Sequence, residues 1–203
     1  MGYTTDFVGH IGVTPALNEA EADYLTAFRS SRRWRRPAGP YAVLLDEEEP
    51  APTGATRHDY HLPPDGQPGL WCDWTPCWDG CCLAYDGSER FAGVGTWLRY
   101  LVEHFLGKDA HASRSGDPRF AGFTFDHVLD GMVVGCRRDN KQLFAVVAER
   151  NRVREEILRA GDRRLRDYGP LPYEREADER RAASPEVARR EAQVLPFTRP
   201  WTA

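Results

Sequence analysis

The chain has 203 residues, of which 41% are hydrophobic and 29% charged, and its formal net charge is −4. This length suits one globular domain with an additional segment, and the acidic balance argues against nucleic-acid binding over the whole surface. The amino terminus lacks the basic and apolar regions of a secretory signal, and no apolar run approaches the ~20 residues needed to cross a bilayer. Five cysteines without an export signal favour a reducing compartment, so we expect a cytoplasmic protein with no membrane partner.

The first third of the chain predicts a strand, a helix and a long loop. Residues 4–13 alternate between two faces, which is typical of a β-strand. Asn18 and Glu21 have the spacing of a helix capping box, and the helix they begin ends in the basic run 29–36. Residues 40–45 are a short strand candidate. The acidic, proline-rich segment that follows has no periodicity and predicts a loop, which reaches to residue 69.

The segment 67–87 contains four of the five cysteines and a turn signal at Asp79-Gly80. If these two residues form the loop of a hairpin, Trp74 pairs with Tyr85, and Trp78 pairs with Cys81. Because side chains alternate along a strand, one face of this hairpin is then apolar and aromatic. The other face is small, polar and acidic.

This alternation also divides the hairpin cysteines between the two faces. A structural zinc ion needs four ligands that converge at about 2.0–2.3 Å, so we expect no bound metal, and no cofactor, here. Cys72 and Cys81 are expected as buried hydrophobic residues. Cys77 and Cys82 are expected as an adjacent pair of reduced thiols on the polar face.

The second half of the chain predicts one strong helix and a meander. Apolar residues recur at helical spacing over residues 94–106, and Gly107 follows them. Turn signals at 130–131 and 139–140 then predict three strands within residues 122–148. This register places His127 in mid-strand opposite Val134. A histidine at such a position is more often structural than a ligand or a base.

The carboxyl-terminal part differs in composition from the rest of the chain. Residues 154–203 are rich in arginine and acidic residues and have few large apolar side chains. We expect a helical or partly disordered extension after a globular domain of residues 1–153. Within the extension, Ser184 followed by Pro185 predicts the start of a helix.

These elements together predict an α+β fold. The expected order is β-α-β-β-β-α-β-β, with an antiparallel sheet of about six strands and two helices packed on one face. The other face of the sheet and the long loop are then the expected places for a functional site.

Several motifs in this chain resemble those of one protein family. The start MGYTTDF, the segment QPGLWCDW, the helix WLRYLVEHFL and an H-x-L-D-G turn are similar to those of small, uncharacterised bacterial proteins. The resemblance covers about residues 1–153. Cys72 matches the pattern, whereas Cys77, Cys81 and Cys82 do not belong to it, which argues further against a metal role. The family has no known activity, so the resemblance implies none.

We expect a non-catalytic binding or accessory protein that uses the open sheet face, with a small molecule or a protein as its partner. A small enzyme with acid–base or metal-assisted chemistry is the first alternative. It depends on Asp73 and Asp86, which the predicted hairpin places opposite each other. Their carboxylates repel unless a cation or a shared proton relieves the repulsion. The candidate ligand-binding residues are Asp73, Asp86, Cys77, Cys82, His58, His61 and His127.

A nucleic-acid binder is the second alternative, and it would use the basic run. Arginine side chains would contact phosphates while the tryptophan stacks on a base. The interpretation that we favour is a helix end whose cations complement the helix dipole and face water. The residues concerned are Arg29, Arg32, Arg33, Trp34, Arg35 and Arg36.

Overall fold

The protein is described by a computed structural model that covers residues 4–36, 38–43, 61–85, 93–167 and 169–182. The strands are β1 (Thr5–Thr14), β2 (Trp74–Pro76), β3 (Cys82–Tyr85), β4 (Val128–Arg137), β5 (Leu143–Glu149) and β6 (Arg152–Arg159). The α-helices are α1 (Glu19–Ser30), α2 (Val94–Leu101), which continues as a π-helix (Val102–Leu106), and α3 (Pro172–Ala182).

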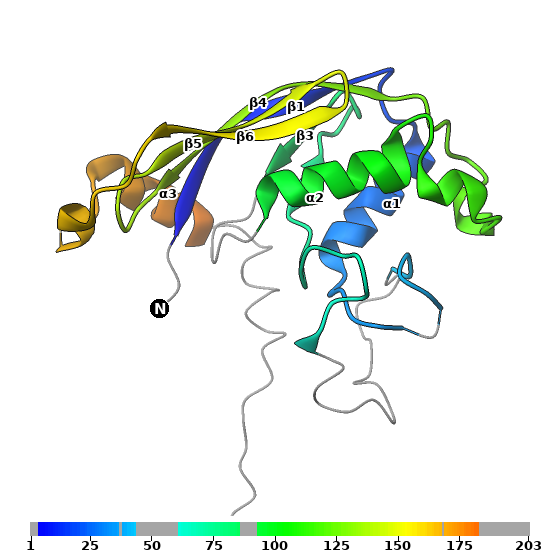
Figure 1. Cartoon of the computed structure of the whole chain (residues 1–203), viewed down its shortest axis with the longest axis horizontal. Coiled ribbons are helices and arrows are strands. Elements are labelled where there is room, and N and C mark those ends of the chain that lie inside the picture. Colours follow the sequence, from blue (N-terminus) through cyan, green and yellow to red (C-terminus); the bar gives the residue numbers. More distant parts are fainter. Residues whose placement is uncertain (1–3, 37, 44–60, 86–92, 168, 183–203) are drawn as a thin grey trace, which may run out of the picture.

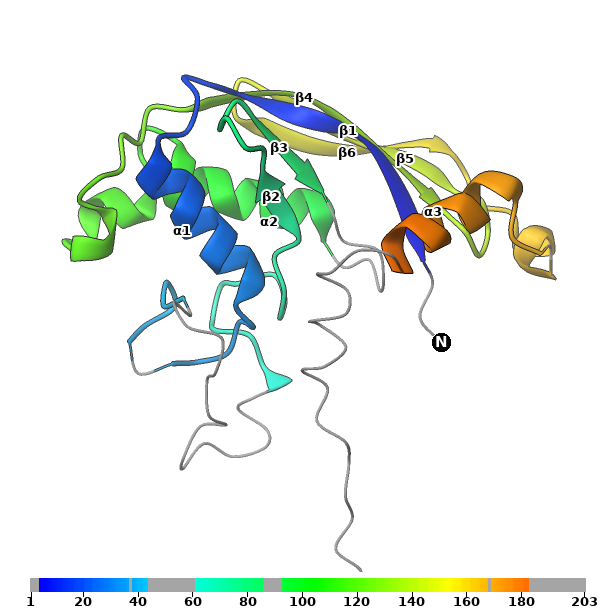
Figure 2. The ribbon, with the colours of Figure 1, turned by 180° about the vertical axis from the view of Figure 1, so that it is seen from behind.

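The strands form one antiparallel sheet in the order β2-β3-β1-β4-β5-β6. Figures 1 and 2 show this sheet as a curved layer with α1 and α2 on its concave side. The helix α3 lies near the end of the sheet that is farther from α1. The expected α+β class and the antiparallel sheet of about six strands are therefore confirmed. The order along the chain is β-α-β-β-α-β-β-β-α, which differs from the predicted order.

The long central pair of strands shows that one predicted turn is wrong. β4 pairs with β1 over ten residues, from Thr5 opposite Arg137 to Thr14 opposite Val128, and it passes straight through Asp130-Gly131. Gly131 has a φ of 141°, and a Cβ there would lie 2.8 Å from the carbonyl oxygen of His10. Glycine is therefore needed at this position for close approach of two backbones, not for a hairpin turn.

Two other differences concern the predicted strands and the domain boundary. The described part of 40–45, residues 40–43, contains no strand. The sixth strand is instead β6, which crosses the boundary predicted at residue 153 and pairs with β5. β6 contains three arginines and two glutamates, and such charged side chains are common on an edge strand because they disfavour pairing with another sheet. The predicted helix start at Ser184 lies outside the described residues.

The two predicted helices are present, and each is capped at its first turn. The side chain of Asn18 accepts a hydrogen bond from the backbone of Glu21, and the Glu21 carboxylate accepts one from the backbone of Asn18, which confirms the capping box. The amino terminus of α2 is capped from the sheet, because the carboxylate of Glu155 on β6 accepts from the backbone N–H of Gly95 at 3.1 Å. β6 therefore both covers the edge of β5 and supports α2.

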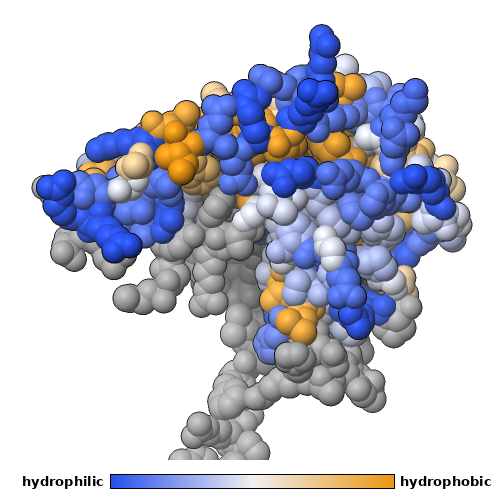
Figure 3. Space-filling model, in the orientation of Figure 1, coloured by the Kyte–Doolittle hydropathy of each residue, from blue (hydrophilic) through white to orange (hydrophobic). Residues whose placement is uncertain are grey.

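The hydrophobic core fills the space between the helices and the concave face of the sheet. It combines an aromatic group from the helices and the following loop with aliphatic side chains from the strands. Its fully buried members include Phe28, Trp97, Phe105, Ile11, Leu83, Leu129 and Val133. On the other face, Val8 is 76% and Met132 49% exposed, and Figure 3 shows apolar surface over the sheet interrupted by polar side chains.

Candidate metal-binding site

The β2–β3 hairpin has the predicted register but a longer loop. Trp74 pairs with Tyr85, as the sequence predicts. At the tip, the backbone N–H of Cys77 donates to the carbonyl of Cys82 at 2.9 Å, and the N–H of Gly80 donates back to the carbonyl of Cys77 at 3.1 Å. The connection is thus a four-residue loop, residues 78–81, and not the two residues Asp79-Gly80.

This longer loop turns two expected core residues outward. Trp78 is 97% exposed, and Cys81 is exposed as well, so their predicted pairing on an apolar face is wrong. The physical reason is that Gly80 adopts a φ of 71°, which ends a turn over residues 77–80 and adds two residues to the loop.

The tip of the hairpin is held against the connection between β1 and α1. The carbonyl of Gly80 accepts from the N–H of Leu17 at 3.0 Å, and the carbonyl of Cys81 accepts from the N–H of Val13 at 2.8 Å. A Cβ on Gly80 would lie 2.5 Å from the carbonyl oxygen of Leu17, so only glycine permits this approach. The backbone of the loop is therefore fixed by its neighbours.

Three cysteines converge on this fixed loop, and we call Cys77, Cys81 and Cys82 the thiol cluster. Their sulfur atoms all lie within 4.8 Å of one another, and the Sγ atoms of Cys77 and Cys81 are 3.8 Å apart. Zn–S bonds of about 2.3 Å in tetrahedral geometry place neighbouring sulfurs about 3.8 Å apart. The Cys77–Cys81 separation therefore matches that of two sulfur ligands on one ion, and the sulfur of Cys82 lies within 4.8 Å of both.

Hydrogen bonds further order the thiol cluster. The backbone N–H of Cys82 donates to the sulfur of Cys77 at 2.9 Å. Asp79 Oδ1 accepts from the thiol of Cys77 at 3.0 Å and from the backbone N–H of Cys81 at 3.3 Å. An N–H donor to sulfur is the kind of contact that orients a metal ligand from outside the first coordination sphere.

The close contacts between the thiols and the Asp79 carboxyl shift the pKa values of these groups. Hydrogen bonds from the thiols of Cys77 and Cys81 lower the pKa of Asp79. The hydrogen bond with Asp79, followed by that with Cys77, raises the pKa of Cys81 to about 12, while burial and the neighbouring Cys77 raise the pKa of Cys82 to about 11. At neutral pH these two thiols are protonated in the metal-free protein, so binding of a metal through them would release their protons.

The other two cysteines are not part of the thiol cluster. Cys72 is 1% exposed, and burial raises its pKa to about 12, in agreement with its predicted role as a buried hydrophobic residue. Cys136 lies on β4 with its sulfur 3.7 Å from the hydroxyl of Tyr173. The prediction that all four hairpin cysteines cannot converge still holds for Cys72, whereas the other three do converge.

The remaining candidates from the loop and the hairpin are not brought together in the described residues. Asp73 is half-buried and has interactions of its own. Asp86, its expected partner, and His58 lie outside the described residues. His61 is exposed, with its Nδ1 3.3 Å from a guanidinium nitrogen of Arg32.

His127 lies just before β4 in a closed polar network, and not in mid-strand. Its Nε2 is 3.0 Å from the Glu21 carboxylate, and its Nδ1 is 2.8 Å from the carbonyl oxygen of Pro15. The same carboxylate accepts from the backbone N–H of Thr124 at 2.7 Å. Because both ring nitrogens face acceptors and the ring is 1% exposed, His127 has a structural role in this network.

The basic run does not form a continuous cationic surface. Arg29, Arg33, Trp34 and Arg36 are all buried, so the expectation that the run faces water is wrong for them. Arg33 is 1% exposed, its guanidinium lies 4.0 Å from the centre of the Phe28 ring, and burial lowers its pKa to about 10. It donates to the carbonyls of Pro40 and Ala42, at 2.7 and 2.9 Å, so it anchors a loop.

The exposed member of the run, Arg35, is also engaged, and the buried tryptophan is covered. Arg35 forms an ion pair with Asp65 at 2.8 Å. The guanidinium of Arg36 lies 5.3 Å from the centre of the Trp34 ring, and Trp34 is only 6% exposed. A ring in this position does not offer a face on which a base can stack.

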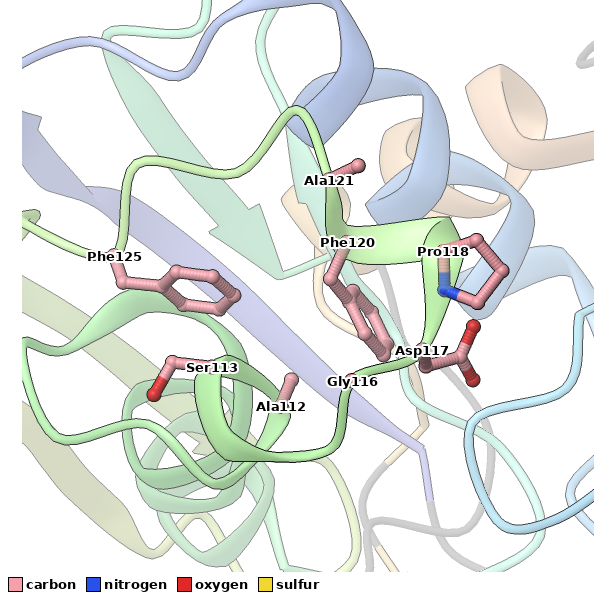
Figure 4. Close-up of a pocket in the computed structure, with 8 residues that line it drawn as sticks. All are labelled: Ala112, Ser113, Gly116, Asp117, Pro118, Phe120, Ala121 and Phe125. Carbon is pink, nitrogen blue, oxygen red and sulfur yellow. The ribbon is translucent and has the colours of Figure 1, made fainter.

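A pocket of about 260 Å³ is lined by the connection between α2 and β4. Figure 4 shows the rings of Phe120 and Phe125 beside it, with Asp117 at one side. Among the described residues that line it, Asp117 is the only ionisable one, and its carboxylate forms an ion pair with Arg119. The pocket therefore lacks a group that is placed for acid–base chemistry.

Comparisons with known proteins assign no family to this chain. A scan against family models, a search of curated proteins and a search of solved structures each gave no match. No helix within the described ranges is long and apolar enough to cross a membrane. The chemistry of the thiol cluster is thus the basis for a functional proposal.

Proposed function

We propose that the protein binds a thiophilic metal ion, with Zn²⁺ as the reference case, through the sulfur atoms of Cys77, Cys81 and Cys82. The observation that supports the proposal is their convergence, with a Cys77–Cys81 sulfur separation of 3.8 Å on a loop whose backbone is already fixed. Thiolate is the ligand that zinc and other soft or borderline ions prefer.

This proposal keeps the class of function favoured by the sequence, a binding or accessory protein, and moves the site from the open sheet face to the hairpin tip. The enzyme alternative depended on carboxylates and histidines that act together. Among its described members, His61 contacts Arg32 while His127 is buried against Glu21, so the two belong to different environments. The nucleic-acid alternative loses its stacking residue, because Trp34 is buried.

Metal titration under reducing conditions tests the proposal. We expect the wild-type protein to bind about one Zn²⁺ or Co²⁺ per chain, with Co²⁺ giving the absorption of a thiolate-bound tetrahedral ion. Replacing Cys81 by serine removes one ligand. Mutating a residue that only supports a ligand can already lower metal affinity by ~100-fold, so we expect at least this loss for Cys81→Ser.

Cys136→Ser is the matched control, because Cys136 lies on β4, outside the thiol cluster. We expect this variant to bind metal like the wild type. Equal affinity of Cys81→Ser and wild type for the metal, in protein with all thiols reduced, would show that the thiol cluster is not the site.

A further inference from the structure

The thiol cluster surrounds an ion from one side only. Its three members come from six consecutive residues, 77–82, and the hydrogen bonds from Val13 and Leu17 hold this loop from the side of the sheet. On the other side Trp78, Asp79 and Cys81 are exposed, and Trp78 is 97% exposed. An ion bound to the three sulfurs therefore faces solvent.

The thiol cluster also differs from a structural zinc site in what a metal ion would contribute to the fold. Structural sites have four protein ligands and a closed coordination sphere, and the metal contributes folding free energy. Here the loop is already closed by backbone hydrogen bonds between Cys77, Gly80 and Cys82, and β2 is already paired with β3. A metal ion would therefore hold together residues that backbone hydrogen bonds already hold together.

Within the described residues, the carboxylate of Asp79 contacts the thiol cluster, and the loop itself already uses it. Asp79 Oδ1 accepts from the thiol of Cys77 and from the backbone N–H of Cys81. If it turned towards a metal, the N–H of Cys81 would lose its acceptor. The loop therefore provides three ligands, while zinc in such sites is four-coordinate.

Resting on the proposed function, we propose that the fourth ligand is a thiolate from another molecule, so that the thiol cluster receives or delivers its metal by exchange of thiolates. Thiolate is a ligand type that suits zinc and softer ions, so an external thiolate can displace water from the fourth position. The incoming thiol binds through its sulfur and releases its proton to solvent, and a water molecule leaves the metal. No electrons are transferred, and the metal keeps its charge.

This arrangement allows direct transfer of the metal. Each further thiol of the receiving molecule would bind the metal and lose its proton, while one cluster sulfur leaves the metal and takes up a proton, so the ion is never released into water. The exposed indole of Trp78 lies in the same loop and offers an apolar contact to the molecule that brings the thiolate. The same chemistry is available to a small free thiol and to a cysteine of a protein.

The experiment uses the full chain loaded with one equivalent of Co²⁺, whose absorption reports its coordination. Glutathione is added, with S-methylglutathione as the matched control that lacks a free thiol. We expect glutathione to change the spectrum to that of a four-sulfur site and to saturate at one thiol per metal. We expect S-methylglutathione to leave the spectrum unchanged.

A second arm distinguishes the two sources of the thiolate. A short peptide with one cysteine is compared with glutathione, in the wild type and in Trp78→Ala. Tighter binding of the peptide that weakens in Trp78→Ala indicates a protein source, whereas equal binding in both variants indicates a small free thiol. Either outcome supports an external thiolate as fourth ligand.

Two results would overturn this inference, and they separate it from the proposed function. If Co²⁺ binds but glutathione does not change its spectrum, the fourth position is closed, and the metal-binding proposal stands without the exchange. If glutathione changes the spectrum only in Asp79→Asn, Asp79 is the fourth ligand in the wild type. Failure of Co²⁺ to bind at all would instead refute the proposed function itself.

Discussion

The carboxylate of Glu21 lies 3.0 Å from Nε2 of His127, and the two side chains are 0% and 1% exposed. Glu21 belongs to the first turn of α1, and His127 directly precedes β4. Their contact therefore joins the start of a helix to the start of a central strand, with hydrogen bonds from Asn18 and Thr124 to the same carboxylate.

We expect Glu21→Gln to lower the free energy of unfolding by about 3 kcal/mol, because it leaves a buried histidine without its charged partner. The matched control is Glu19→Gln, an exposed acid in the same helical turn, which should change stability by less than about 0.5 kcal/mol. Urea unfolding at neutral pH measures both, and similar values for the two variants would show that the Glu21–His127 contact contributes little.

His104 predicts a dependence of stability on pH. Burial of the ring, with a smaller effect of His111, lowers the pKa of His104 to about 4, and its Nδ1 lies 2.7 Å from the hydroxyl of Tyr41. The unfolded chain takes up this proton near pH 6.5 and the folded chain only near pH 4, so stability is full above about pH 6.5 and falls as the pH drops towards 4.

Because the ring is partly exposed, we reduce the effect for solvent screening and expect a loss of about 1–2 kcal/mol over this range. Unfolding measured at several pH values should show a flatter profile between pH 6.5 and 4 in His104→Gln. His10→Gln, on an exposed position of β1, should keep the wild-type profile. An unchanged profile in His104→Gln would contradict the assignment.

The position of β6 predicts where the chain can be shortened. A chain that ends after Gly161 keeps all six strands and loses α3, which is bound through the ion pairs Arg138–Asp178 and Lys141–Glu174. We expect it to unfold cooperatively, with a loss of about 1–2 kcal/mol.

A chain that ends after Asn151 also loses β6, and with it the Glu155 cap of α2 and the cover of the edge of β5. We expect this shorter chain to lose its cooperative transition. Thermal unfolding followed by circular dichroism compares the two, and a sharp transition in the shorter chain would mean that β6 is not required for the fold.

The dipeptide Asp-Gly shows how far local sequence predicts this fold. At Asp79-Gly80 it correctly indicated a hairpin and the register of Trp74 with Tyr85, although the loop is two residues longer than expected. At Asp130-Gly131 the same dipeptide lies inside β4, because ten residues of pairing with β1 outweigh a local turn preference. Pairing between distant strands is not visible in a local pattern.

The thiol cluster and β6 were missed for related reasons. Alternation along two ideal strands separates Cys77 from Cys81, and only the turn ended by Gly80, held against Leu17, brings their sulfurs to 3.8 Å. β6 has charged residues on both faces, so its sequence matched a solvated helix as well as an edge strand. The contact of Glu21 with His127 was not predicted, since it joins positions far apart in the chain. The capping-box pattern did identify Glu21, but only for its helical role.

X-ray absorption at the zinc edge of the metal-loaded protein tests the central claim most directly, because it counts the sulfur atoms bound to the ion and measures their distance. We predict a shell with at least three sulfurs at about 2.3 Å in the wild type, and one sulfur fewer in Cys81→Ser. A shell made only of nitrogen and oxygen atoms, at about 2.0–2.1 Å, would contradict binding by the thiol cluster.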